Sequence, residues 1–92
     1  MTLDEFFVRL AQTERGWVVN ADGEIRFGHG VGCHCPLSRV AGTHPCSVSD
    51  SSNALGLPWH MAHNVAAAAD DVEFGTLRQR LLTACGLTER AS

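Results

Sequence analysis

The sequence has no long apolar run, no secretory leader pattern and no cluster of basic residues. No stretch approaches the roughly 20 apolar residues that a helix needs to cross a bilayer. The first residues show no basic start, apolar run and small-residue cleavage site of the kind found in secretory signals. The net charge is −3, whereas broad phosphate binding relies on clustered Lys and Arg. These absences predict a cytoplasmic protein with no membrane partner and no general affinity for nucleic acid.

Common catalytic signatures are also missing. The chain contains no glycine-rich phosphate loop and no pair of carboxylates at a recognisable catalytic spacing. Its 92 residues are enough for one domain, residues 1–92, but leave little room for a substrate cleft. The hydrophobic fraction of 45% and charged fraction of 18% are those of a folded globular chain, not of a disordered one. We therefore expect a single compact domain and favour a non-catalytic protein over an enzyme.

The start of the chain has the apolar spacing of an amphipathic helix. The residues of its expected buried face are Leu3, Phe6, Phe7 and Leu10. Thr2 and Glu5, three residues apart, match a capping box, and Gly16 supplies a stop. The sequence thus predicts an N-terminal helix.

The segment WVVNADGEIRF has the alternation of two strands around a turn. If Gly23 takes the left-handed position of a three-residue loop, Trp17 faces Phe27 and Val19 faces Ile25. A two-stranded hairpin is marginal in water by itself. Its apolar face should therefore lie on the helices.

Four further helices are predicted, at residues 36–41, 48–55, 59–71 and 72–85. Proline favours the first turn of a helix and glycine its end, which sets most of these limits. The expected buried stripe of the last helix is Phe74, Leu77, Leu81 and Ala84. The sequence therefore predicts an α+β fold, mainly helical, with an N-terminal helix, one β-hairpin and then three to four short helices.

The segment HGVGCHCPLSRVAGTHPC, residues 29–46, holds three of the four cysteines and three of the five histidines. Structural zinc takes four sulfur or nitrogen ligands, presented from two tight turns. The ligand set that we predict is Cys33, Cys35, His44 and Cys46. Against it, Cys-X-Cys is less usual than Cys-X-X-Cys, and reduced cysteines are often small buried hydrophobes. Zinc is the one cofactor that the sequence suggests, and plain packing of the cysteines is its alternative.

Cys35 also precedes a predicted helix, where the positive end of the dipole lowers a thiol pKa. A cysteine enzyme would need a histidine base, for which His63 or His60 on a later helix is the candidate. No local signature of a known cysteine hydrolase surrounds Cys35. Catalysis by Cys35 with His63 as base is therefore a lesser hypothesis.

Residues 47–70 resemble a helix-turn-helix motif in outline. The second helix of this pair carries His60, His63 and Asn64 but no Lys or Arg that could reach phosphates. Nucleic-acid binding is therefore disfavoured. Trp17 and Trp59 are expected in the core, although a surface Trp59 would give a partner interface or a homodimer seam.

A broader pattern runs from residue 17 to residue 87. It comprises W…G-E-I-R, C-P-L-S-R-V-A, L-G-L, A-D and L-L-T-A-C-G-L. The pattern resembles small proteins of phages and bacteria, which carry no assigned activity, so the resemblance implies no catalytic or binding residue. It implies that the Cys-Pro pair belongs to the scaffold and that Cys33, His34, His44 and Cys46 are additions.

The function that we expect is a small protein-binding module or accessory factor, encoded by a phage or mobile element, whose partner is another protein. The alternatives are a zinc-stabilised small domain that uses the cluster at 29–46, a cysteine-dependent enzyme with Cys35 as nucleophile, and a helix-turn-helix DNA binder. Each depends on which side chains the fold brings together.

Overall fold

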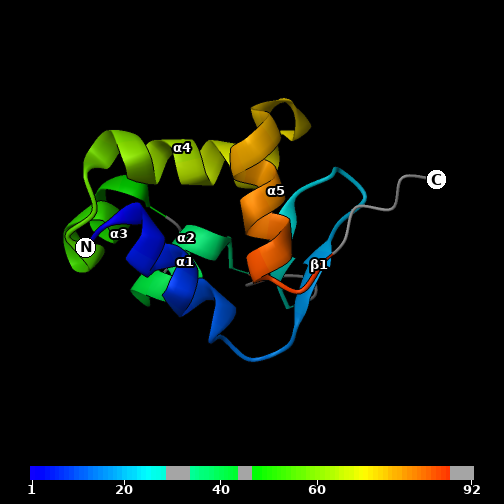
Figure 1. Ribbon diagram of the computed structural model, residues 1–92, viewed down its shortest axis with the longest axis horizontal. Helices are drawn as coiled ribbons and strands as arrows, with labels where there is room; N and C mark the ends of the chain where they lie inside the picture. Colours follow the sequence, from blue (N-terminus) through cyan, green and yellow to red (C-terminus); the bar gives the residue numbers. More distant parts are fainter. Residues whose placement is uncertain (29–33, 44–46, 88–92) are drawn as a thin grey trace.

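A computed structural model describes residues 1–28, 34–43 and 47–87 of the chain. Its elements in order are α1 (Leu3–Ala11), β1 (Trp17–Val19), β2 (Ile25–Phe27), α2 (Pro36–Ala41), α3 (Val48–Leu55), α4 (Trp59–Asp70), the 3₁₀ turn η1 (Val72–Phe74) and α5 (Gly75–Ala84). The predicted α+β, mainly helical fold is confirmed (Figure 1). Within the described ranges, no helix has both the length and the apolar character to span a membrane.

The N-terminal helix begins as its sequence predicts. The Thr2 hydroxyl accepts a hydrogen bond from the Glu5 amide at 3.2 Å, and the Thr2 amide donates to the Glu5 carboxylate at 3.3 Å. Two otherwise unpaired amides of the first turn are thereby satisfied. Phe6 and Leu10 are fully buried and Phe7 nearly so, which confirms the predicted apolar face.

The hairpin also has the predicted register, with Trp17 opposite Phe27 and Val19 opposite Ile25. Gly23 has φ +85°, a left-handed conformation that suits glycine. The Trp17 and Phe27 rings meet edge to face with centroids 5.1 Å apart, a favourable geometry for aromatic pairs. After Phe27, the chain pairs once more, because Phe27 and His34 exchange two backbone hydrogen bonds of 2.7 and 3.1 Å.

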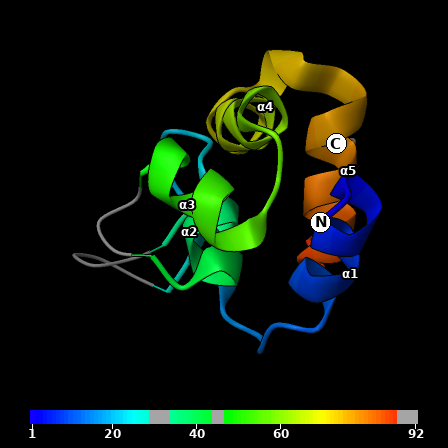
Figure 2. The same cartoon turned by 90° about the vertical axis from the view of Figure 1, so that its left-hand side faces the viewer.

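The helices enclose one core between them. Figure 2 shows α1 and α5 side by side, α2 and α3 on the opposite side, and α4 in contact with both groups. The hairpin packs against α2 and α4. Residues from each side are fully buried, among them Phe6, Leu10, Ile25, Leu37, Val65 and Leu81. The apolar face that a lone hairpin could not bury is thus covered by helices, as expected.

The last helix differs from the prediction. The segment 72–85 is broken by η1 and by Gly75, which has φ +52°, so α5 starts only at Gly75. This break changes the helical phase. Phe74 is 38% exposed, whereas Arg78, Leu81 and Leu82 carry the buried stripe. The predicted burial of Phe74 is therefore wrong, and the charged Arg78 occupies the core face instead. The predicted burial of Leu81 is confirmed, and Leu77 and Ala84 are partly buried against the core.

Burial of Arg78 is compensated by backbone oxygens. Its Nη1 donates to the carbonyls of Ala68 and Ala69 at 3.3 and 3.2 Å, and its Nη2 donates to the carbonyl of Gly23 at 2.7 Å. The first two belong to the last turn of α4, whose carbonyls have no partner within the helix and carry the negative end of its dipole. Arg78 therefore joins α5, the end of α4 and the turn of the hairpin.

Replacing this guanidinium should be costly. We expect Arg78→Met to lower the free energy of unfolding by about 3 kcal/mol, because three carbonyls, two of them buried, lose a charged donor. Arg80→Met, two residues later on α5, should cost less than about 1 kcal/mol, since the Arg80 pair with Asp4 is largely exposed. Urea unfolding of both variants measures the difference, and equal midpoints would contradict the role of Arg78.

Candidate functional site

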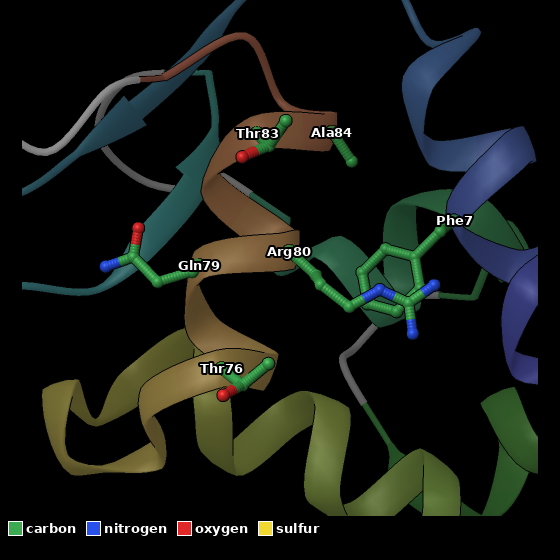
Figure 3. A pocket seen from close by; sticks show the side chains of 6 residues that line it. All are labelled: Phe7, Thr76, Gln79, Arg80, Thr83 and Ala84. Carbon is green, nitrogen blue, oxygen red and sulfur yellow. The ribbon is translucent and has the colours of Figure 1, made fainter.

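A surface groove lies between α1 and α5 (Figure 3). Its volume is about 360 Å³ and its lining residues are Phe7, Thr76, Gln79, Arg80, Thr83 and Ala84. The Arg80 guanidinium stacks 4.2 Å from the centre of the Phe7 ring, and it also pairs with Asp4 at 2.9 Å. The sequence does not predict this groove, because nothing in it relates Arg80 to Asp4 on a helix 76 residues earlier.

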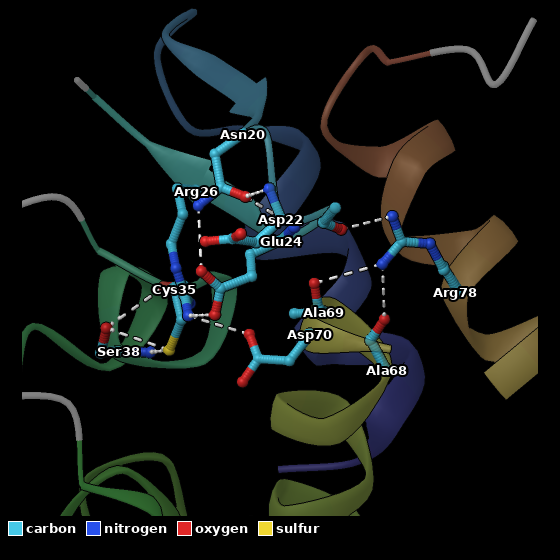
Figure 4. A network of polar contacts seen from close by, with 11 residues as sticks. Asn20, Asp22, Glu24, Arg26, Cys35, Ser38, Ala68, Ala69, Asp70 and Arg78 are labelled. Atoms are coloured by element: carbon cyan, nitrogen blue, oxygen red, sulfur yellow. Dashed lines mark hydrogen bonds and ion pairs between the residues drawn. The ribbon is translucent and has the colours of Figure 1, made fainter. Parts of the chain in front are cut away.

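A second concentration of polar groups lies where the hairpin meets α2 and α4 (Figure 4). Arg26 on β2 donates to Glu24 at 2.8 Å and to Asp70, the last residue of α4, at 2.9 Å. Asn20 donates to the other oxygen of Glu24 at 2.9 Å. These contacts fix the side of the hairpin against the end of α4.

The groups of this network shift one another's protonation. Burial lowers the pKa of Arg26, but the negative charges of Asp70 and Glu24 outweigh it, so the net shift is upward. The hydrogen bond from Asn20 is the main cause of a lowered pKa at Glu24. Burial raises the pKa of Asp70 although Arg26 opposes it. The pKa values of the two carboxyl groups that pair with Arg26 are thus shifted in opposite directions.

Cys35 is the N-cap of α2, which confirms its predicted place at a helix start. Its sulfur accepts a hydrogen bond from the Ser38 amide at 3.4 Å, and the Ser38 hydroxyl lies 3.3 Å from the same atom. The Cys35 side chain is near enough to Arg26 to contribute to the raised pKa of that guanidinium, so the two groups are neighbours. The residue is only 4% exposed and belongs to the core cluster.

Three of the four predicted zinc ligands, Cys33, His44 and Cys46, lie outside the described residues. Within the ranges 1–28, 34–43 and 47–87, no three His, Cys, Asp or Glu side chains come together as a metal site would need. The zinc hypothesis stays a prediction, with Cys35 as its one described ligand.

His63, the candidate base, lies in the first half of α4. Its ring stacks on that of Trp59, with centroids 5.1 Å apart and planes 6° from parallel. Cys35 instead neighbours Arg26, whose partner Asp70 follows His63 by seven residues, or about 10 Å along the helix axis. Cys35 and His63 thus have different partners, and their pairing in catalysis stays a prediction.

The two tryptophans have opposite environments. Trp17 is 7% exposed and its indole donates to the Thr13 hydroxyl at 2.8 Å, as expected for a core residue. Trp59 is 55% exposed, so its expected core position is wrong. The reason is that α4 reaches the core only after its first turn, through small side chains such as Ala62. Trp59 precedes that contact and stays at the surface.

Comparisons with protein-family models, curated proteins and solved structures found no match. The function is therefore inferred from these residues alone.

The remaining described cysteine, Cys85, ends α5. Burial raises the pKa of its thiol to about 12. We expect slow alkylation by iodoacetamide at pH 8, where about one thiol in 10⁴ would be ionised, and a rise of about tenfold per pH unit. Peptide mapping at several pH values measures this rate. A rate at pH 8 equal to that of the urea-unfolded chain would contradict the protonated, buried thiol.

Proposed function

We propose that this protein is a small non-catalytic module that binds another protein through the first turns of α4. The binding surface consists of Trp59, His60, His63 and Asn64, and we name it the Trp59 surface. All four side chains are exposed. The main support for this proposal is that Trp59 is 55% exposed. Tryptophan is enriched among the residues that dominate binding energy at protein interfaces.

The stacking of Trp59 on His63 supports this proposal. The two residues are four apart on α4, so they lie on the same face of the helix. Stacking restricts the rotamers of both side chains before any partner arrives, and this restriction reduces the side-chain entropy lost on binding. The surface thus combines a flat aromatic side chain with ring nitrogens and an amide that can form hydrogen bonds. This mixture of apolar and polar groups is found at protein interfaces.

The fold does not depend on the Trp59 surface. On its opposite side, α4 buries Ala62, Val65, Ala68 and Ala69 against the rest of the chain. The stability of the domain comes from that buried side, so the exposed aromatic serves no packing need of α4. A role in binding accounts for a large apolar side chain at this position.

Trp59→Ala should therefore remove partner binding and change stability by no more than about 0.5 kcal/mol. The control is Val19→Ala, which shortens another apolar side chain that is 44% exposed, on β1. The measurement is quantitative capture from the cells that encode the protein, followed by calorimetric titration of the purified candidate partner. Identical protein sets captured by the wild type and by both variants would contradict the proposal.

A zinc-stabilised form of the same module is the second candidate. It is favoured by the surroundings of the Cys35 sulfur, which accepts the Ser38 amide and has the Arg26 guanidinium as a neighbour. With Cys33, His44 and Cys46, zinc would join the segments on both sides of α2 and contribute to the free energy of folding.

The zinc candidate predicts a mass excess of one zinc ion in native mass spectrometry, lost after acid denaturation. Cys35→Ser and Cys46→Ser should lower the melting temperature by similar amounts and abolish its sensitivity to a chelator, because each removes one of four ligands. Cys85→Ser is the matched control outside the ligand set. The bare chain mass, with melting unaffected by chelator, would contradict zinc binding.

A further inference from the structure

β1 is an edge strand of the sheet. β2 has neighbours on both sides, because it pairs with β1 along its length and its Phe27 also exchanges two backbone hydrogen bonds with His34. Among the described residues, β1 pairs with β2 alone. Figure 1 shows β1 on the opposite side of the molecule from the start of α4. One side of β1 therefore has no neighbouring strand.

The hydrogen-bonding pattern of the hairpin determines which backbone groups lie on that free side. The carbonyl of Gly16 and the amide of Asn20 each form a hydrogen bond of 2.9 Å across the hairpin. In an antiparallel pair, successive residues direct their backbone groups alternately toward the partner strand and away from it. Trp17 and Val19 therefore direct their amides and carbonyls away from β2. Within the described residues these groups make no hydrogen bond, and such an edge is a template for another strand.

We propose that a second copy of this chain adds its β1 to this edge, antiparallel and related by a two-fold axis at Val18. The two outward residues lie one on each side of Val18, so the axis places Trp17 of each copy opposite Val19 of the other. Their amides and carbonyls then bond to one another across the seam, and the two hairpins form one sheet of four strands. Val19, which is 44% exposed, gains an aromatic neighbour of the kind that stabilises strand pairs.

The charges at the two ends of β1 favour a second copy over an unrelated strand. Arg15 is the nearest charged residue before β1 and Asp22 the nearest after it, and both are exposed. An antiparallel pair brings the start of one β1 to the end of the other, so Arg15 of each copy meets Asp22 of its partner. Glu14, which repels Asp22, lies one residue farther from the strand. Arg15 also lines a cavity of about 400 Å³ at the start of β1, with Trp17 and Gly86. This cavity leaves room for the hairpin turn of the other copy.

The seam is short, because β1 has three residues. Interfaces below roughly 1,200 Å² are typical of weak complexes, so the dimer should form only at high protein concentration. The start of α4, which carries the Trp59 surface, lies on the other side of the molecule and stays exposed in the dimer. The dimer does not depend on the proposed function, and each can fail without the other.

Sedimentation equilibrium at protein concentrations up to about 1 mM tests the dimer. Val19→Pro removes an amide from the free edge and keeps the bonds between β1 and β2, since an edge strand accepts proline where its nitrogen faces outward. It should raise the dissociation constant at least about tenfold, whereas Val19→Ala keeps the amide and should change the constant less than about threefold. Circular dichroism verifies that both variants are folded. A wild-type chain that is monomeric at every concentration, or equal constants for the two variants, would overturn the proposal.

The antiparallel arrangement has its own test at low salt. Arg15→Glu and Asp22→Arg should each weaken the dimer several-fold, because each brings like charges together at both ends of the seam. An equimolar mixture of the two variants should associate as tightly as the wild type, since opposite charges then meet at both ends. No recovery in the mixture would overturn this arrangement. A dimer lost in Trp59→Ala but kept in Val19→Pro would place the seam on the Trp59 surface and overturn the β1 contact.

Discussion

The guanidinium of Arg78 is the contact on which the rest of the structure depends. A buried cation needs hydrogen-bond acceptors around it, and here acceptors for both terminal nitrogens come from the hairpin turn at Gly23 and from the end of α4. The short hairpin gains an attachment that two strands cannot supply by themselves. The last carbonyls of α4 gain the donor that a helix end requires.

Attachment of the hairpin determines the surroundings of Cys35. Arg26, on the strand that Arg78 helps to hold, pairs with Asp70 and neighbours the thiol. Phe27, the next residue, pairs through its backbone with His34, which directly precedes Cys35. The start of α2 is thus held to β2, through Arg26 next to Cys35 and through the backbone pair of Phe27 and His34. A thiol placed beside a cation follows from this docking rather than from the local sequence.

Among the described residues, the large apolar side chains that stay exposed after the core is formed are Val8, Val19, Trp59 and Phe74. Val8 and Trp59 lie on helices whose buried faces are complete without them. Isolated exposed apolar residues are common on proteins, but Trp59 has an organised neighbour, the stacked ring of His63. This stacked neighbour distinguishes Trp59 from incidental exposure.

The sequence by itself determined the local features of this fold. The capping box at Thr2, the hairpin register and the ends of α2 and α3 depend on residues close together in the chain, so local rules predict them. Only the tertiary structure decided that Arg78 is buried instead of Phe74, that Trp59 is exposed, and that Arg80 meets Phe7 to line a groove. The physical reason is that burial and these contacts depend on which elements pack together, and the partners of Arg78 and Arg80 lie up to 55 and 76 residues away.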